Sequence, residues 1–283
     1  MKTASTIKRR VIQALAVCIL AGGCGVLVHA AGEAGKIDGY TNTPLQPGGK
    51  WTVHDPRRPQ PVIVTPGTPS TQDAPGKAPS DAIVLFDGKD LSKFKKSNWK
   101  VQDGYVQVGG GQLTSIQEFG DVQVHVEWLA SKAIKGSGQK RGNSGVFLMG
   151  KYEIQVLDCY ENQTYPDGMT GSVYGQTPPQ VNACLPQEKW HSYDIIFTIP
   201  EFEGKKLVKP AYFTVLLNGV VVQNHTEVRG PCTWRNLAKY KAHGPTGPLS
   251  FQAHGNPMRY RNIWVRPLNP PTQNAPAAAA ASK

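Results

Sequence analysis

The sequence has almost no stretch in which apolar residues recur with the 3.6-residue period of a helix, so the helical fold classes are not expected. The glycines at 109–111 are not followed by a helix, which argues against a dinucleotide-binding loop. The cysteine spacings match no zinc site, and no basic helix or aromatic-plus-basic stretch of a nucleic-acid-binding protein occurs. We therefore expect neither a dinucleotide-dependent oxidoreductase nor a nucleic-acid partner.

No apolar run is long enough for a comfortable membrane span. Four basic residues precede the apolar run 11–20, and Val28-His29-Ala30 fits a signal-peptidase site. We expect residues 1–30 to be a signal peptide and the mature protein, without a transmembrane segment, to be periplasmic or secreted. The alternative is a lipoprotein anchored at Cys24, although Leu20 stands one residue too far from that cysteine.

The formal net charge is +11 at pH 7, and it falls to +7 without the four basic residues of the leader, which holds no acid. The other basic residues are scattered or lie near the N-terminus, as Arg57 and Arg58 do. We interpret this charge as a source of solubility and loose surface attraction.

Proline, glycine and threonine dominate residues 31–80, which predicts an extended arm and linker. Trp51 and the apolar residues at 62–64 could dock this arm, which leaves 65–80 as the expected free linker. The low-complexity tail at 269–283 is expected to be disordered.

Short strands separated by turn signals fill residues 81–268. Residues 121–128 alternate between apolar side chains, which we expect to face inward, and polar ones that include His125 and Glu127. Asn218-Gly219 predicts a tight hairpin turn. Further strands are expected at 82–86, 105–108, 112–115, 190–199, 213–217, 220–223, 249–254 and 259–266. This pattern predicts an all-β sandwich, a jelly roll with a ligand-binding polar face.

The central stretch, residues 141–160, contains two short strands joined by Gly150-Lys151. The second strand alternates, with Glu153 and Gln155 on the face opposite its apolar residues. Asp158 has the other parity and joins that face only if a bulge intervenes. A carboxylate beside an amide can act on a sugar; a half-solvated strand is the other interpretation of the same pattern.

A long loop, residues 161–189, follows this strand and carries tyrosines, amides and Cys184. Rings that stack on sugar faces and amides that reach hydroxyls make sugar recognition its expected role. Three cysteines follow the leader, an odd number that predicts one disulfide and one leftover thiol. We expect the Cys159–Cys184 pair, which would pin this loop, and leave Cys232 free.

Several long motifs, in order, resemble the "domain of unknown function 1080" family, described as 3-keto-disaccharide hydrolase or 3-keto-glucoside lyase and 3-keto-glucal hydratase. They are LFDGKDLSKF (85–94), RGNSGVFLMGKYEIQVLDCY (141–160), GSVYGQTPPQVNA (171–183), NGVVVQNH (218–225) and AHGNPMRYRNIWVRPL (253–268). The resemblance implies a concanavalin A-like jelly-roll sandwich of two antiparallel sheets over 81–268. It also implies an enzyme that cleaves 3-keto-glycosides by elimination and hydration, downstream of a separate sugar 3-dehydrogenase.

The resemblance also directs attention to particular residues. Glu153 matches the YE-x-Q-x-LD motif and is our first candidate for acid–base work, and His254 of the HGNP motif is the second. Asp158 is a third catalytic candidate that could tune one of these or help to hold a divalent cation, for which no ligand set is identified. Expected contacts to the carbohydrate are Arg141, Asn143, Gln155, Tyr174, Gln176 and Gln252.

Two departures from the family pattern matter. Cys159 and Cys184 replace small polar residues, which supports the predicted disulfide. Ala253 stands where an acidic residue is expected, which puts the use of a metal in doubt. The alternative to an enzyme is a non-catalytic carbohydrate-binding module on the same fold.

Overall fold

The computed structural model describes residues 38–268, so the predicted signal peptide, the alternative anchor at Cys24 and the predicted tail lie outside the described residues. The chain divides into two units between Val62 and Ile63. In the first unit, Leu45 and Thr52 pair by a single bridge, and Asp55 forms an ion pair with Arg57 at 2.7 Å. Within the described part of the chain, no helix has the length and apolar character to cross a membrane.

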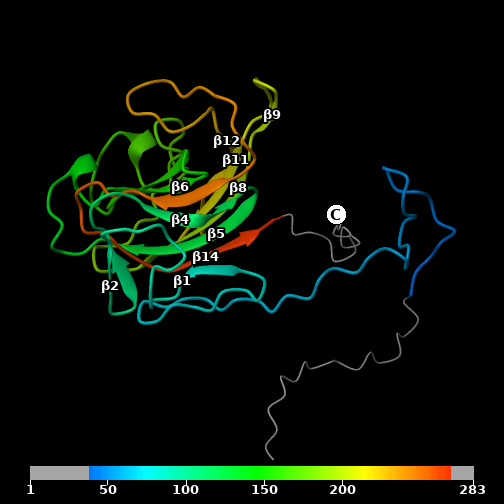
Figure 1. Cartoon of the computed structure of the whole chain (residues 1–283), viewed down its shortest axis with the longest axis horizontal. Helices are drawn as coiled ribbons and strands as arrows, with labels where there is room; N and C mark the ends of the chain where they lie inside the picture. Colours follow the sequence, from blue (N-terminus) through cyan, green and yellow to red (C-terminus); the bar gives the residue numbers. More distant parts are fainter. Residues whose placement is uncertain (1–37, 269–283) are drawn as a thin grey trace, which may run out of the picture. The chain divides into compact units, whose positions relative to one another are not determined.

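Two antiparallel sheets form the second unit (Figure 1). The large sheet has the order β12 (Val220–Glu227), β11 (Tyr212–Leu217), β8 (His191–Thr198), β5 (Val122–Leu129), β14 (Arg259–Pro267), β3 (Tyr105–Gln107) and β2 (Lys100–Gln102), with β1 (Ile83–Phe86) also paired to β14. The small sheet has the order β4 (Leu113–Phe119), β13 (Gly247–Phe251), β6 (Ser144–Leu148) and β7 (Tyr152–Val156). A hairpin of β9 (Glu201–Glu203) and β10 (Lys206–Lys209) and two 3-10 turns, η1 (Gly138–Lys140) and η2 (Pro166–Gly168), complete the elements.

The inner faces of the two sheets meet in an aromatic-rich core. The ring of Phe251 in β13 lies 5.1 Å from that of Tyr260 in β14, and Tyr152 in β7 lies 5.5 Å from Phe197 in β8. These four side chains are fully buried, so they contribute much of the apolar area that drives the sheets together. The predicted all-β jelly-roll sandwich is confirmed.

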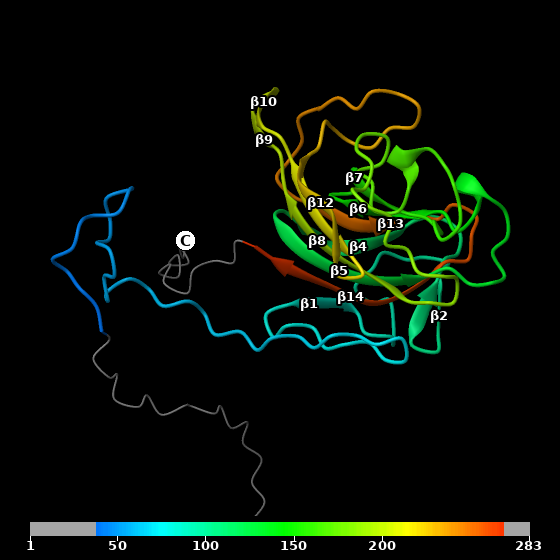
Figure 2. The same cartoon turned by 180° about the vertical axis from the view of Figure 1, so that it is seen from behind.

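Strand β5 follows the predicted alternation. Val122, Val124, Val126 and Trp128 are buried in the core, whereas His125 and Glu127 point to the outer face of the large sheet. That outer face is covered, however, because residues 65–80, here called the strap, run along it (Figure 2). The expectation that 65–80 is a free linker is therefore wrong.

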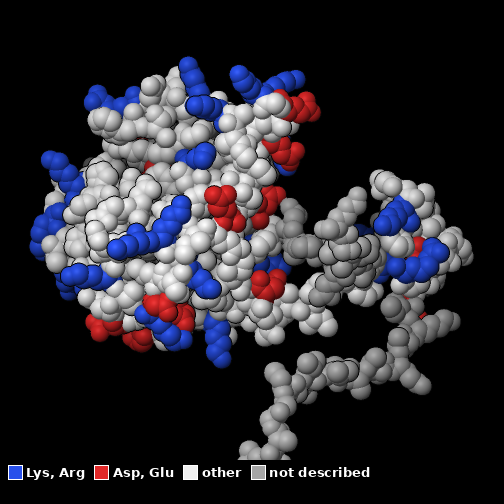
Figure 3. Space-filling model, in the orientation of Figure 1, with Lys and Arg blue, Asp and Glu red and all other residues white. Residues whose placement is uncertain are grey.

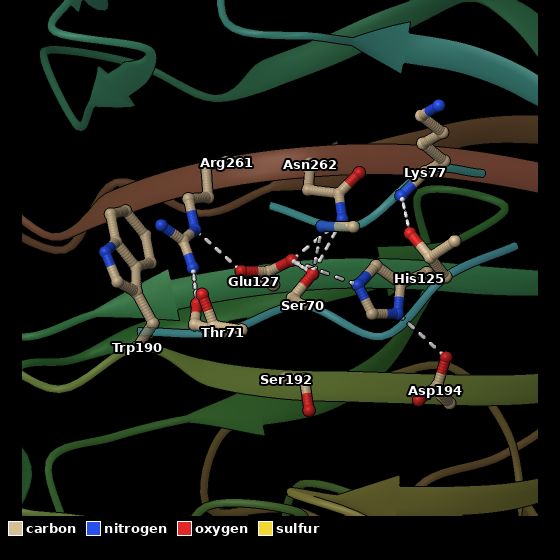
Figure 4. A network of polar contacts seen from close by, with 12 residues as sticks. Ser70, Thr71, Lys77, His125, Glu127, Trp190, Ser192, Asp194, Arg261 and Asn262 are labelled. Atoms are coloured by element: carbon tan, nitrogen blue, oxygen red, sulfur yellow. Dashed lines mark hydrogen bonds and ion pairs between the residues drawn. The ribbon is translucent and has the colours of Figure 1, made fainter. Parts of the chain in front are cut away.

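Hydrogen bonds hold the strap to the large sheet (Figure 4). Ser70 donates to Glu127 Oε1 at 2.5 Å, and Arg261 Nη2 donates to the carbonyl oxygen of Thr71 at 2.6 Å. Gln72 bonds the backbone of Trp190 through both ends of its amide, at 2.8 and 2.9 Å. The strap therefore satisfies polar groups that the sheet alone would leave unpaired.

A buried ion pair lies beneath the strap. Glu127 Oε2 accepts from Arg261 Nε at 2.6 Å, and both side chains are less than a tenth exposed. Burial opposes ionisation of Glu127, but hydrogen bonds from His125, Ser70 and Arg261 prevail and lower its pKa to about 2. Burial likewise opposes protonation of His125, yet its bonds to Asp194 and Glu127 raise its pKa to about 9.

Charged residues are spread over the face of the second unit that Figure 3 presents. Figure 3 shows lysine and arginine side chains scattered over one face, with acidic side chains between them, and no single basic patch on that face. This distribution agrees with a general contribution of charge to solubility.

Replacement of Glu127 by alanine should lower the free energy of unfolding by about 3 kcal/mol, because Arg261 would stay buried without its partner. Trypsin should also cut faster after Lys77 in the strap. Chemical denaturation and limited proteolysis measure the two effects. Asp81→Ala, which removes the more exposed ion pair with Arg266, is the control and should cost far less. Equal losses in the two variants would contradict the role given to the Glu127 network.

Candidate active site

A cavity of about 330 Å³ opens on the outer face of the small sheet. Its floor is formed by β7, and its walls come from the turn around η1, the loop 161–176 and the segments that flank β13. In Figure 1, the segment that joins β12 to β13, coloured orange, lies beside the small sheet, on the side away from β5 and β14. The lining residues are Gln139, Asn143, Glu153, Gln155, Tyr165, Tyr174, Cys232, Trp234, Gln252 and His254. We call this hollow the carboxyl cavity.

Glu153 is the acidic side chain of the carboxyl cavity. The alternation of β7 turns it away from the core residues Tyr152 and Ile154, as predicted, but the loops above leave it only 3% exposed. Burial raises the pKa of Glu153 to about 7, against a smaller lowering by the thiol of Cys232, which donates to Oε2 at 2.7 Å. A carboxyl group in this state can both accept and donate a proton near neutral pH.

The neighbouring strand makes room for this carboxyl. Gly145 in β6 pairs with Gln155, and a Cβ atom on Gly145 would lie 2.2 Å from Glu153 Oε1. Glycine is therefore required there for the observed position of the Glu153 side chain. The Gln155 amide, with its nitrogen turned toward β6, can donate to the carbonyl oxygen of Ser144 at 2.8 Å and to Glu153 Oε1 at 3.3 Å.

Several predicted contact residues line the same cavity as Glu153. His254 lies exposed on the segment after β13, so an imidazole and a buried carboxyl, distant in sequence, share one hollow. Asn143 is fixed by a bond from its Nδ2 to the carbonyl oxygen of Gln139 at 2.9 Å. Tyr174 meets Tyr165 through their hydroxyls at 3.0 Å. Together with Gln155 and Gln252, these side chains can bind hydroxyl groups of a ligand.

Asp158 and Arg141 do not line the carboxyl cavity. Asp158 is 4% exposed, and its Oδ2 lies 2.9 Å from Arg141 Nε and 2.9 Å from Gln187 Nε2. β7 ends at Val156, and no bulge brings Asp158 onto the face of Glu153. Asp158 is therefore the anion that pairs with Arg141. Because Arg141 directly follows η1, this pair fixes the turn around η1.

Gln176 is also absent from the cavity lining. Its Oε1 accepts from the backbone N–H of Arg229 at 2.7 Å, and its Nε2 donates to the carbonyl oxygen of Gly230 at 2.9 Å. Both ends of the amide are therefore used to hold the segment that carries Cys232 and Trp234. Gln176 positions a wall of the cavity and does not face it.

Sequence reasoning missed Gln139 and Trp234 and treated Cys232 only as a leftover thiol. Tyr165 was included only as one of the tyrosines of the loop 161–189. Trp234 is 70% exposed, in a segment without regular structure between β12 and β13. A tryptophan in such a segment, beside proline, glycine and threonine, is the sequence signal that could have pointed to it. Nothing in the local pattern relates Cys232 to Glu153, which stands 79 positions earlier.

The two cysteines of the predicted disulfide are neighbours. The structure holds Cys159 and Cys184 as free thiols, and the Cys184 thiol beside Cys159 lowers the pKa of Cys159 below its usual value. The backbone N–H of Thr170 also donates to the sulfur of Cys159, at 3.2 Å. The positions suit the predicted pairing, but the bond is not formed in this structure, so the disulfide stays a prediction.

The residues around Asp158 do not fit a divalent cation. Its carboxylate oxygens are already used by Arg141 and Gln187. Among residues 38–268, no three His, Cys, Asp or Glu side chains group as metal ligands. No step of the chemistry proposed below passes through a metal ion.

The fold and the cavity define a carbohydrate-active jelly-roll protein, and comparison with known proteins gives its family. The profile of the 3-keto-alpha-glucoside-1,2-lyase-like domain matches residues 81–266, so the chain belongs to this family. A candidate glycosyl hydrolase from Parabacteroides distasonis ATCC 8503, solved at 2.13 Å, is 43% identical, with a TM-score of 0.72. The match covers 80% of this chain and all of that one.

A second candidate glycosyl hydrolase from the same organism, solved at 2.00 Å, is 18% identical. Its TM-score is 0.50, and the match covers 66% of this chain and 99% of that one, which supports the shared fold alone. A search of curated proteins found no match.

Replacement of Glu153 by glutamine should change the pH dependence of stability. The native pKa of about 7 lies above the ordinary value of 4.5, so the native state holds the proton more tightly than the unfolded chain. The stability due to this proton is fully present below pH 4.5 and is lost as pH rises through 7. Relative to Glu153→Gln, the wild-type protein should lose about 3 kcal/mol of unfolding free energy between pH 4 and pH 8.

Denaturation curves of the two proteins at several pH values measure this difference. Glu118→Gln, at an exposed carboxyl of β4, is the control. A constant gap between wild type and Glu153→Gln at all pH values would contradict the raised pKa.

Proposed function

We propose that this protein is an exported enzyme that cleaves 3-keto-glycosides by elimination followed by hydration. The observation that carries the proposal is the buried Glu153 carboxyl, with a pKa of about 7, in a cavity whose other walls supply amides and an imidazole. Membership of the 3-keto-alpha-glucoside-1,2-lyase-like family supports it. A non-catalytic binding module would have no need to hold an acid in this costly environment.

The proposed elimination uses the ketone at C3 of the sugar. The ketone acidifies the proton on C2; a base removes that proton, and the C2–H electrons form the C1=C2 bond while the C1–O bond breaks. The departing oxygen takes a proton from an acid. Water then adds across C1=C2, with hydroxide at C1 and a proton at C2, which yields a 3-keto monosaccharide. The net reaction is hydrolysis, so no oxidant is consumed.

Glu153 is suited to the role of base. Burial destabilises its ionised form, so that form accepts a proton more readily than an ordinary carboxylate does. His254 lies exposed in the lining of the same cavity and is suited to protonate the departing oxygen. In this proposal, Asn143, Gln155 and Gln252 bind the sugar hydroxyls and the ketone oxygen, and their place in the cavity lining supports that role.

The proposed substrate requires an earlier reaction. An alcohol at C3 must be oxidised to a ketone before this site can act, so a sugar 3-dehydrogenase on another chain would supply the substrate. The basic, apolar leader predicts that the protein meets this substrate in the periplasm or outside the cell.

Incubation with a 3-keto-disaccharide and with its unoxidised parent tests the proposal. Product should form only from the oxidised sugar, and Glu153→Gln should reduce kcat at least about a hundredfold while binding persists. His254→Gln should lower kcat less for substrates with a good leaving group. Thr246→Ala, at an exposed position outside the carboxyl cavity, is the control. Binding of both sugars without turnover of either would instead support a carbohydrate-binding module.

The thiol of Cys232 should set the pH at which the enzyme becomes active. Because its hydrogen bond favours the ionised Glu153, Cys232→Ala should raise the pKa of Glu153 further and move the acidic limb of kcat/KM to higher pH. Cys232→Ser keeps a donor and should restore the wild-type limb. Steady-state rates from pH 5 to pH 9 measure the limb; a profile unmoved in Cys232→Ala would exclude Glu153 as the group that titrates.

A further inference from the structure

A second and larger hollow, of about 710 Å³, lies beside the carboxyl cavity. The two share the side chains of Tyr165, Tyr174 and Trp234, so they adjoin each other at these three residues. The other walls of the second hollow are Asp167, Gly175, Thr233, Arg235, Asn236 and Leu237. We call it the outer cavity.

The outer cavity differs from the carboxyl cavity in its chemistry. Leu237 is 81% exposed and Trp234 is 70% exposed, three positions apart on one loop. Large apolar side chains that stand together in water beside a candidate active site indicate a surface that a ligand covers. The carboxyl cavity, by contrast, is lined mostly by amides, Glu153 and His254, as a sugar requires.

The loop that carries these apolar side chains is anchored at its start. The backbone N–H of Cys232 donates to the carbonyl oxygen of Lys151 at 2.8 Å, and the Cys232 thiol donates to Glu153. Gln176 bonds the two residues before Pro231. The guanidinium of Arg235 lies over the indole of Trp234, 5.2 Å from its centroid. The ring therefore lines the same cavity as the proposed reacting carboxyl, on a segment whose start is fixed.

We propose that the outer cavity is the subsite for the leaving group and that it takes a hydroxylated aromatic aglycone, as in a phenolic glycoside. The inference rests on the proposed function, because it places the 3-keto sugar at Glu153. The C1 substituent then extends past the two tyrosines, which line both cavities, to Trp234. A planar ring can stack on the indole and cover Leu237, whose side chain can form no hydrogen bond with a second sugar.

The polar residues of the outer cavity agree with hydroxyl groups on that ring. Asp167 can accept from a phenolic hydroxyl, and Arg235 and Asn236 can donate to one. In the proposed elimination, a phenolic oxygen also leaves C1 more easily than a sugar hydroxyl does, because its conjugate acid is stronger.

Three ligands separate the contributions of the two cavities: 3-keto-glucose, a 3-keto-disaccharide, and a 3-keto-glucoside of a dihydroxyphenol. Calorimetric titration of the Glu153→Gln protein measures binding without turnover. The aryl glucoside should bind at least about tenfold more tightly than 3-keto-glucose, the gain expected when one aromatic face is covered. Trp234→Ala and Leu237→Asn, added to Glu153→Gln, should each remove most of this gain. Leu237→Asn, which lies outside the carboxyl cavity, should leave the affinity for 3-keto-glucose unchanged.

Two further variants complete the design. Trp234→Phe keeps an aromatic face and should keep most of the gain. Val208→Ala, at an exposed apolar position of β10 outside both cavities, is the matched control and should change nothing. In the wild-type background, KM for the aryl glucoside should rise in Trp234→Ala.

Each outcome is decisive. If 3-keto-glucose binds and the aryl group adds no affinity, the aglycone subsite is overturned while the proposed function stands. An equal gain from the disaccharide, lost in Trp234→Ala, would make the outer cavity a sugar subsite and overturn the aromatic assignment. If no 3-keto sugar binds at all, the proposed function fails, and the inference falls with it.

Discussion

The burial of one carboxyl group, that of Glu153, is the constraint on which the site depends. The small sheet supplies its position, because the alternation of β7 sends Tyr152 and Ile154 into the core and Glu153 to the outer face. Gly145 in the adjacent strand leaves the space that the carboxyl occupies. The loops above then remove water from it, and the loss of hydration raises its pKa to about 7.

Loops can desolvate a carboxyl only if they are themselves held in place. The ion pair of half-buried Arg141 with buried Asp158 fixes the turn around η1, and Gln176 fixes the segment that carries Cys232. On the far face of the sandwich, the Glu127 network holds the strap against the large sheet. These polar side chains thus hold the backbone of loops and strap in place, and none of them lines the carboxyl cavity.

The sequence predicted which face of a strand a residue occupies, because that follows from the period-2 alternation of side chains. It placed Glu153 and Gln155 opposite the core residues of the same strand, and His125 and Glu127 on an outer face. It failed where the partner of a polar side chain is distant in the chain. Nothing local distinguishes Gln176, which bonds a backbone, from Gln252, which lines the cavity, and nothing local brings Cys232 to Glu153. The resemblance to family motifs also directed attention to Asp158 and Arg141, which pair with each other and do not line the carboxyl cavity.

The most direct test of this account is the titration of Glu153 itself. Carbon-13 NMR of the glutamate side-chain carboxyls, with the resonance assigned by its absence in Glu153→Gln, reports the pKa without reference to any substrate. The account predicts a midpoint of about 7. A midpoint near 4.5, the ordinary value for glutamate, would show a solvated carboxylate and contradict the proposed role of the cavity.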